Sequence, residues 1–134
     1  MASKGSHLLL LSHAVILLLC ASTATTGAQP QEVTGARRSI AGIAAVFTYN
    51  AIAGGHLRFY GTLSAILVPH AFYLNIDLYH VTVIFVTHLS GLGLPTLETS
   101  VMTFAVPHGQ YPSLRNITRD SFEYTAFVIY HRTY

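Results

Sequence analysis

The stretch AFYLNIDLYHVTVIFVTH, residues 71–88, constrains the fold more than any other part of the chain. Apolar and polar side chains alternate along it with a period of two, which places them on opposite faces of a β-strand. A membrane-spanning helix has no reason to keep that period, although the stretch is apolar enough for one. We therefore expect residues 71–88 to form strand structure.

The alternation changes phase inside this stretch. Apolar side chains occupy even-numbered positions up to Leu78 and odd-numbered positions from Tyr79 onward. One additional residue in a strand, as in a β-bulge or a tight turn, exchanges the two faces in this way. The sequence thus predicts two strand pieces that meet near Tyr79, with Asp77 near a solvent-accessible edge.

Several further segments have the composition of short strands separated by loops. The strand candidates are rich in Val, Ile, Thr, Tyr and Phe, and cover residues 56–60, 62–68, 101–106 and 121–134. Glycine and proline mark the loops at residues 90–96 and 107–113. This pattern predicts a mainly β domain, built as a small antiparallel sandwich or barrel.

Residues 39–55, SIAGIAAVFTYNAIAGG, fit two different structures. Apolar residues recur at helical spacing, which predicts one short helix over residues 40–53, capped by Ser39 and ended by Gly54. Because the intervening positions are apolar too, such a helix must be buried. The competing interpretation is a strand over residues 44–50 that turns into the next strand candidate.

The N-terminus has the layout of a secretory signal. A charged start precedes the apolar run LLLLSHAVILLL, residues 8–19, and small residues follow. Residues 1–28 are therefore expected to be a signal peptide, with removal after Ala28 favoured over removal after Ala24. A linker at residues 29–38 and a single β-rich domain at residues 39–134 would follow. The alternative is an uncleaved membrane anchor.

Charge and cysteine content narrow the classes of function. Charged residues make up 9% of the chain, against about 25% in typical soluble domains, and the formal net charge is only +2. The arginines are scattered, so we expect no nucleic acid partner. The low charge is also compatible with a membrane protein, whose hydrophobic spans would be residues 39–57, 59–76 and 78–97. The only cysteine, Cys20, lies in the signal segment, so the domain would be free of disulfides.

Six of the eight histidines follow residue 28, which raises the question of a metal site. His80 and His88 share one face of a strand, but about 26 Å separates them at the rise of a strand, too far for two zinc ligands. Asp77 and His80 lie on opposite faces of a regular strand. No G-x-S-x-G or H-E-x-x-H signature is present. We therefore expect no metal, no cofactor and no catalytic residue.

The candidate ligand-binding residues are polar or amphipathic positions on the predicted strands, namely His56, Arg58, Tyr60, Asp77 and His80. Tyrosines add amphipathic contact surface, because each combines an apolar ring with a polar tip. The tyrosines expected to serve in this way are Tyr60, Tyr73, Tyr79, Tyr111, Tyr124, Tyr130 and Tyr134.

A glycosylation sequon occurs at Asn116-Ile117-Thr118. It lies in the polar stretch SLRNITRD, which we expect to be exposed. An exported chain made in a glycosylating host would then carry a glycan on Asn116. A chance match of the pattern is the alternative, because serine and threonine are common in this chain.

Two short patches, HLRFY at residues 56–60 and EYTAFVIYH at residues 123–131, resemble the plant dirigent family. Members of that family are secreted β-barrel proteins that steer radical coupling without performing redox chemistry themselves. The resemblance therefore implies a β-barrel fold. Gly61 and Thr62 stand where the family has an acidic residue, and the patches are closer together than in the family, so no functional residue is carried over.

These patterns predict an exported, disulfide-free, mainly β domain that binds a partner protein or a small apolar ligand and is not a catalyst. The alternative, from a different class, is a small integral membrane protein or membrane-complex subunit with two to three hydrophobic spans. Its localisation would be the membrane instead of the extracellular space. A chain that does not fold stably is a third hypothesis, suggested by the low charge and the lack of a strong motif.

Overall fold

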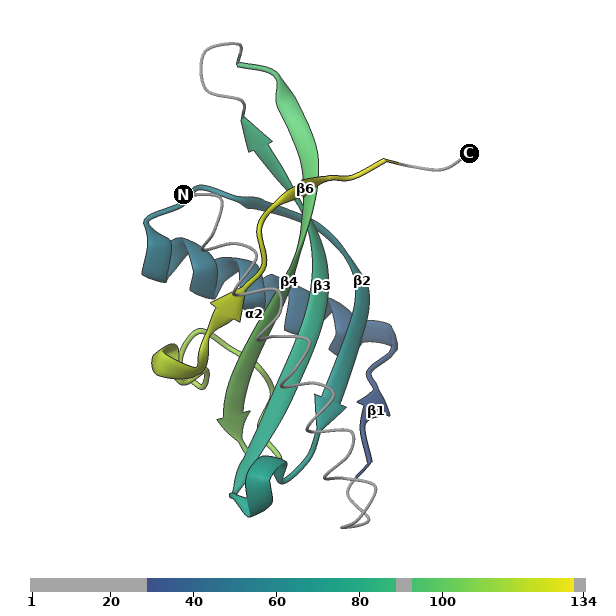
Figure 1. The fold of residues 1–134 in the computed structure, drawn as a ribbon, viewed down its shortest axis with the longest axis vertical. Helices are drawn as coiled ribbons and strands as arrows, with labels where there is room; N and C mark the ends of the chain where they lie inside the picture. Colours follow the sequence, from purple (N-terminus) through teal and green to yellow (C-terminus); the bar gives the residue numbers. More distant parts are fainter. Residues whose placement is uncertain (1–28, 89–92, 132–134) are drawn as a thin grey trace.

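A computed structural model describes residues 29–88 and 93–131. The elements in chain order are β1 (Gln31–Glu32), α2 (Gly35–Ala53), β2 (Arg58–Val68), the 3₁₀ helix η1 (Ala71–Tyr73), β3 (Ile76–His88), β4 (Pro95–Pro107), the 3₁₀ helix η2 (Arg119–Ser121), β5 (Glu123–Tyr124) and β6 (Val128–Ile129). The strands form one antiparallel sheet in the order β1-β2-β3-β4-β5, and β6 also pairs with β4. The prediction of a mainly β antiparallel fold is confirmed, and the sheet is bent like a barrel wall but is not closed (Figure 1).

The segment with two interpretations forms the helix α2. It starts after Thr34 instead of Ser39, and it ends at Gly54, whose φ of 65° is the left-handed conformation that glycine adopts without strain. Small residues on the buried side let the helix approach the sheet closely. A Cβ at Gly42 would overlap the side chain of Thr62 in β2, so this close approach depends on glycine. The strand interpretation of residues 44–50 is wrong.

The segment before the helix takes part in the fold. Gln31 and Glu32 pair with Leu67 and Ile66 of β2, and the Val33 side chain is buried in the core. Residues 31–38, part of the stretch expected to be a linker, therefore contain β1 and the first turn of α2.

The strand β3 is continuous, so the predicted break near Tyr79 is wrong. Its pairing with β4 runs without a shift from Ile76 opposite Pro107 to His88 opposite Pro95. The register shifts occur in β2 instead, between Phe59 and Gly61 and between Thr62 and Ser64. The apolar phase changes because both faces of the sheet bury side chains near this end of β3.

The outer face, away from α2, has its own small cluster of apolar residues. Leu78 packs there with Val68, Ala71 and Ala105, while the next residue, Tyr79, points into the main core. Two successive buried residues on opposite faces produce the same pattern as a bulge when only the sequence is read.

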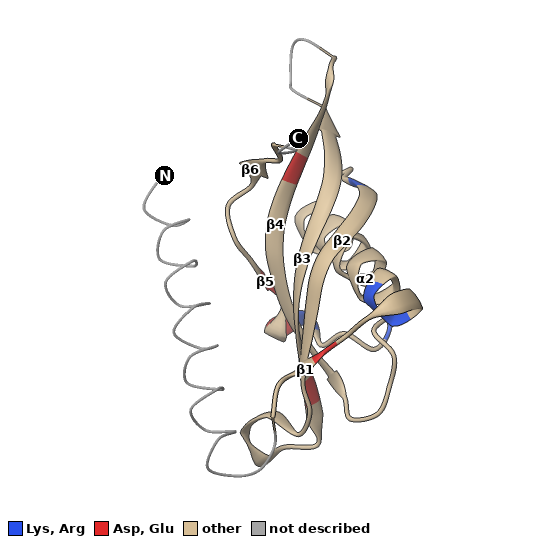
Figure 2. Ribbon diagram, turned by 90° about the vertical axis from the view of Figure 1, so that its right-hand side faces the viewer, with Lys and Arg blue, Asp and Glu red and all other residues tan. Residues whose placement is uncertain are grey.

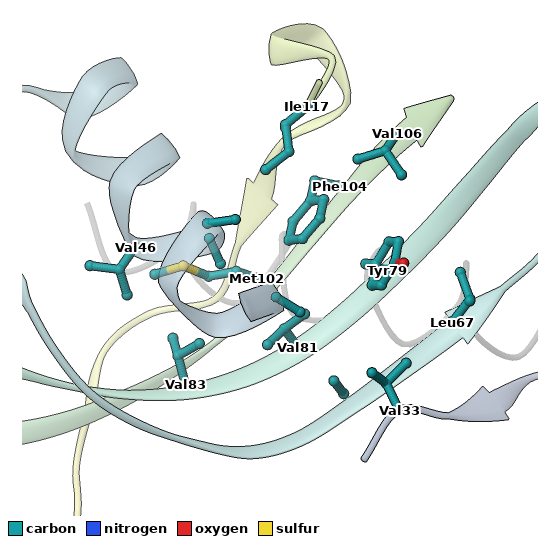
Figure 3. Packing of buried hydrophobic residues seen from close by; sticks show 14 of the residues in the cluster. Val33, Val46, Leu67, Tyr79, Val81, Val83, Met102, Phe104, Val106 and Ile117 are labelled. Atoms are coloured by element: carbon teal, nitrogen blue, oxygen red, sulfur yellow. The ribbon is translucent and has the colours of Figure 1, made fainter. Parts of the chain in front are cut away.

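The main core lies between α2 and the sheet face that it covers (Figure 2). Fully buried side chains from β3 and β4 form its centre, with Val46 from the helix and Ile117 from the segment after β4 (Figure 3). Phe127 from the C-terminal segment packs edge-on against Phe85, with ring centroids 4.6 Å apart. The C-terminal segment is expected from its sequence to form one long strand. In its described part, residues 121–131, strand structure is confined to β5 and β6, and Phe122, Tyr124 and Phe127 pack by their aromatic rings.

The signal-peptide prediction, its anchor alternative and Cys20 fall on residues 1–28, outside the described residues, and stay predictions. Among residues 29–88 and 93–131, no helix is both long and apolar enough to cross a membrane. The hydrophobic segments proposed as spans at residues 59–76 and 78–97 consist mainly of β2 and β3 where the structure describes them.

Candidate functional site

Two turns lie side by side at one end of the sheet. The strands β2 and β4 lie on either side of β3, and both terminate at the same end of the sheet, which is the lower end in Figure 1. Both end in the same six-residue pattern, Val-Pro-His-x-x-Tyr, at residues 68–73 and 106–111. Proline ends each strand because it has no N–H to donate to a neighbour. We call residues 69–75 the first turn and residues 107–112 the second turn.

The first turn has an unusual backbone. His70, Phe72 and Tyr73 have φ values of 49°, 56° and 60°, all in the left-handed region. That conformation costs each residue other than glycine about 1–2 kcal/mol of conformational free energy. Such a backbone persists only where the surrounding structure holds it, and it is frequent at functional sites.

The same turn exposes large apolar side chains. Phe72, Tyr73 and Leu74 are 57%, 81% and 55% exposed, and Tyr111 of the second turn is 59% exposed. Single exposed apolar residues are normal on protein surfaces, but three in succession on a strained turn are not. The two turns together therefore form an apolar, aromatic projection at the end of the sheet.

Asp77, near the start of β3, ties the two turns together. Its Oδ1 accepts hydrogen bonds from His108 Nδ1 at 2.7 Å and from the His70 backbone N–H at 3.3 Å. Its Oδ2 accepts a hydrogen bond from the Gly109 backbone N–H at 3.0 Å. The Asn75 carbonyl adds a second link between the turns by accepting from the His108 N–H at 3.1 Å. We call Asp77, His70, His108 and Gly109 the clamp.

The carboxylate of the clamp is buried, since Asp77 is only 3% exposed. Burial by itself raises the pKa of the Asp77 carboxyl. The hydrogen bonds from His108, Gly109 and His70 outweigh burial and hold that pKa below its ordinary value. Asp77 is therefore an anion at neutral pH.

The two histidine rings of the clamp lie face to face. Their centroids are 3.7 Å apart, and their planes differ by 29°. The bond to Asp77 requires a proton on His108 Nδ1, which leaves Nε2 as an acceptor in the neutral ring. An oriented histidine of this kind also occurs in acid–base catalysis, but here one face of the ring is covered by His70. The main effect of the Asp77–His108 bond and of the ring stack is to fix the position of the two turns.

The second turn also contacts the helix. The Arg37 guanidinium lies over the Tyr111 ring, 5.3 Å from its centroid. Burial raises the pKa of Tyr79, and the nearby Arg37 guanidinium opposes that shift. The start of α2, β3 and the second turn are thus connected through one arginine.

The structure does not gather the five predicted ligand-binding residues into one site. His56, Arg58 and Tyr60 lie at or just before the start of β2 and are exposed. Arg58 pairs opposite Val86, which is about 30 Å along β3 from Asp77 at the rise of a strand. The predicted group therefore divides between two ends of the sheet.

Asp77 and His80 are on opposite faces of β3, as their spacing predicts. His80 Nδ1 lies 3.1 Å from Thr103 Oγ1 on the face away from α2. The prediction that Asp77 lies near a solvent-accessible edge is wrong. The two turns fold over its carboxylate, which the strand pattern by itself does not indicate.

Sequence reasoning missed most of this site. It did not select His70, Phe72, Leu74, His108 or Gly109, and of the predicted contact tyrosines Tyr79 proves buried. The signal was available in the repeated Val-Pro-His-x-x-Tyr pattern, which only gains meaning once β2 and β4 are known to end together. Within the part of the chain that the structure describes, no three His, Cys, Asp or Glu side chains are grouped to hold a metal ion.

No protein-family model, curated protein or solved structure matches this chain. The dirigent-like patches lie at the start of β2 and in the segment containing β5 and β6, away from both turns. The assignment of the site therefore depends on the geometry of the two turns.

Proposed function

We propose that the protein is an exported interaction module that docks its two turns into a concave surface of a partner protein. The observation that carries this proposal is the run of exposed apolar side chains at Phe72, Tyr73 and Leu74 on a strained turn. Covering water-exposed aromatic side chains with a partner lowers the free energy, and aromatic residues are enriched in protein interfaces.

The clamp supports this proposal because it holds the turns in place before binding. A flexible loop loses conformational entropy when it docks, whereas a turn that is already fixed loses less. The hydrogen bonds to Asp77 and the stacked rings of His70 and His108 supply that rigidity.

A protein partner fits the shape of the site better than a small apolar ligand. Small ligands are usually enclosed in concave pockets. Here the apolar side chains are exposed at a projecting end of the sheet, so the concave surface would belong to the partner.

Export is part of the proposal and is supported by the signal-like residues 8–19. A glycan on Asn116 would be consistent with export. The Asn116 side chain donates a hydrogen bond to the Tyr111 carbonyl, so a glycan would lie beside the second turn. Because Ile117 is buried in the core, we expect addition before folding. Loss of a glycosidase-sensitive gel shift in Asn116→Gln tests this point.

The docking proposal is tested by site-specific photocrosslinking. A benzoylphenylalanine replaces Tyr73 in the full chain, and the same residue replaces Tyr60 as the control. Both tyrosines are well exposed, at 81% and 60%, but Tyr60 lies toward the other end of the sheet. We expect one discrete adduct from position 73, made in extracellular material of the producing organism, and none from position 60.

Competition separates specific docking from chance contact. An excess of unlabelled wild-type protein should abolish the adduct, and an excess of Phe72→Ser should not. Adducts from position 60 alone, or equal competition by the two proteins, would contradict docking through the turns.

A further inference from the structure

The two stacked histidines of the clamp share one carboxylate, that of Asp77, but only one of their rings contacts it. One ring, that of His108, donates directly to Asp77, and the other, that of His70, lies on it at 3.7 Å. Only the backbone N–H of His70 reaches the carboxylate. Asp77 therefore balances a positive charge on His108 much better than one on His70.

Histidine is the side chain whose ordinary pKa lies between pH 5 and pH 8, and the stack consists of two of them. Other titratable or charged groups near this end of the sheet are Asp77, Tyr79 and His80 of β3, Tyr73 and Tyr111 of the two turns, Arg37 of α2 and Glu32 of β1. His80 lies on the face of β3 opposite Asp77, where its Nδ1 is 3.1 Å from Thr103 Oγ1. Arginine stays charged and tyrosine stays neutral over this range, and carboxylates remain ionised. Asp77 also stays ionised over this range, because its pKa is lowered below the ordinary value of an aspartate.

We propose that the His70–His108 stack is a pH-sensitive latch, which holds the two turns together at neutral pH and releases the first turn in mildly acidic surroundings. This inference rests on the proposed docking function and adds its regulation. Release would weaken docking, because the fixed arrangement of Phe72 and Tyr73 would be lost.

The mechanism follows from the charges that acid adds to the two rings. A charged His108 ring lies beside the Asp77 anion, which is its hydrogen-bond partner. A second proton on His70 then places two cations face to face at the stacking distance, with only one carboxylate beside them. Their repulsion opposes the stack, and the left-handed backbone of the first turn favours its opening. Acid therefore loosens the turn, and neutral pH restores it.

Hydrogen exchange of the full chain, without a partner, tests the latch. The reporters are amides that join or shape the turns: His108, Gly109 and Leu74. Their protection factors, corrected for intrinsic exchange, should fall about tenfold or more between about pH 7.5 and about pH 5.0. Amides paired in the centre of β3 and β4 should keep theirs.

Two matched variants isolate the effect of the stack. His70→Phe keeps a ring to stack but cannot be protonated, so the fall in protection should disappear. His88→Phe, an exposed histidine at the far end of β3, should behave as the wild type. A wild type with unchanged protection at about pH 5.0, or the same fall in His70→Phe, would overturn the latch.

The experiments distinguish failure of the latch from failure of the docking proposal. A pH-dependent opening without a position-73 adduct would retain the latch and reject docking. An adduct with the same yield at both pH values and no opening would retain docking and reject the latch.

Discussion

The two turns share a sequence pattern but differ in backbone. In the second turn the left-handed conformation falls on Gly109, with a φ of 81°, where no side chain is strained. In the first turn it falls on His70, Phe72 and Tyr73, all with bulky side chains. The first turn also has two exposed aromatic residues, Phe72 and Tyr73, whereas the second turn has Tyr111.

This difference separates two tasks. The second turn is a support, because its Gly109 N–H and His108 ring both donate to Asp77. In the docking proposal the first turn is the element that contacts the partner, and its strain is offset by the same carboxylate and by the stacked ring of His108. A strained turn beside an unstrained one with the same pattern indicates that its conformation serves a purpose other than stability.

Asp77→Leu should have the largest effect, because it removes the group that both turns share. Three donors would lose their acceptor, and we expect a loss of about 3–5 kcal/mol in the free energy of unfolding, measured by urea denaturation. Asp120→Leu is the control, since Asp120 is exposed, and it should change stability by less than about 0.5 kcal/mol. Equal stability of Asp77→Leu and wild type would mean that Asp77 lies at an open edge, as the sequence by itself predicts.

Gly109→Ala should damage the supporting turn by a smaller amount. A Cβ there meets no atom within 4 Å, so the cost comes from the positive φ alone, about 1–2 kcal/mol. Gly61→Ala also places its Cβ in open space but has no positive φ, and it should not destabilise the protein. The two urea midpoints together test whether backbone conformation is the cause.

Tyr73→Gly should have the opposite sign, because it relieves strain in the first turn. We expect a gain of about 0.5–1 kcal/mol, which is the left-handed penalty less the entropy that glycine adds to the unfolded chain. Tyr60→Gly, which removes an exposed tyrosine from β2 outside the left-handed region, should instead destabilise. Destabilisation by both substitutions would argue that Tyr73 is not strained.

The pH dependence of stability should show the smallest effect, because burial and hydrogen bonding shift the pKa of Asp77 in opposite directions. The net shift is downward from 3.8, so the folded protein holds the proton less tightly than the unfolded chain. The contribution is fully present above about pH 4 and is lost as pH falls through the folded pKa. The stability difference between wild type and Asp77→Asn should therefore shrink on acidification below about pH 4, and a difference that grows there would contradict the assignment.

The sequence predicts the large elements and not the site, for a physical reason. Alternation identifies β3, and helical spacing together with Gly54 identifies α2, because both depend on neighbours along the chain. The environment of Asp77 depends on residues 31 and 32 positions further along the chain, which the sheet register brings to it. Leu78 misled the prediction of a bulge because it is buried on the face of the sheet away from the helix.

The central claim is that Asp77 joins the two turns into one surface, and NMR contacts between the His70 and His108 rings test it most directly. Centroids at 3.7 Å predict strong nuclear Overhauser effects between the ring protons at neutral pH. The same signals should weaken or vanish in Asp77→Asn, which removes the charge that orients His108. Absence of these contacts in the wild type, or contacts of equal strength in Asp77→Asn, would contradict the account.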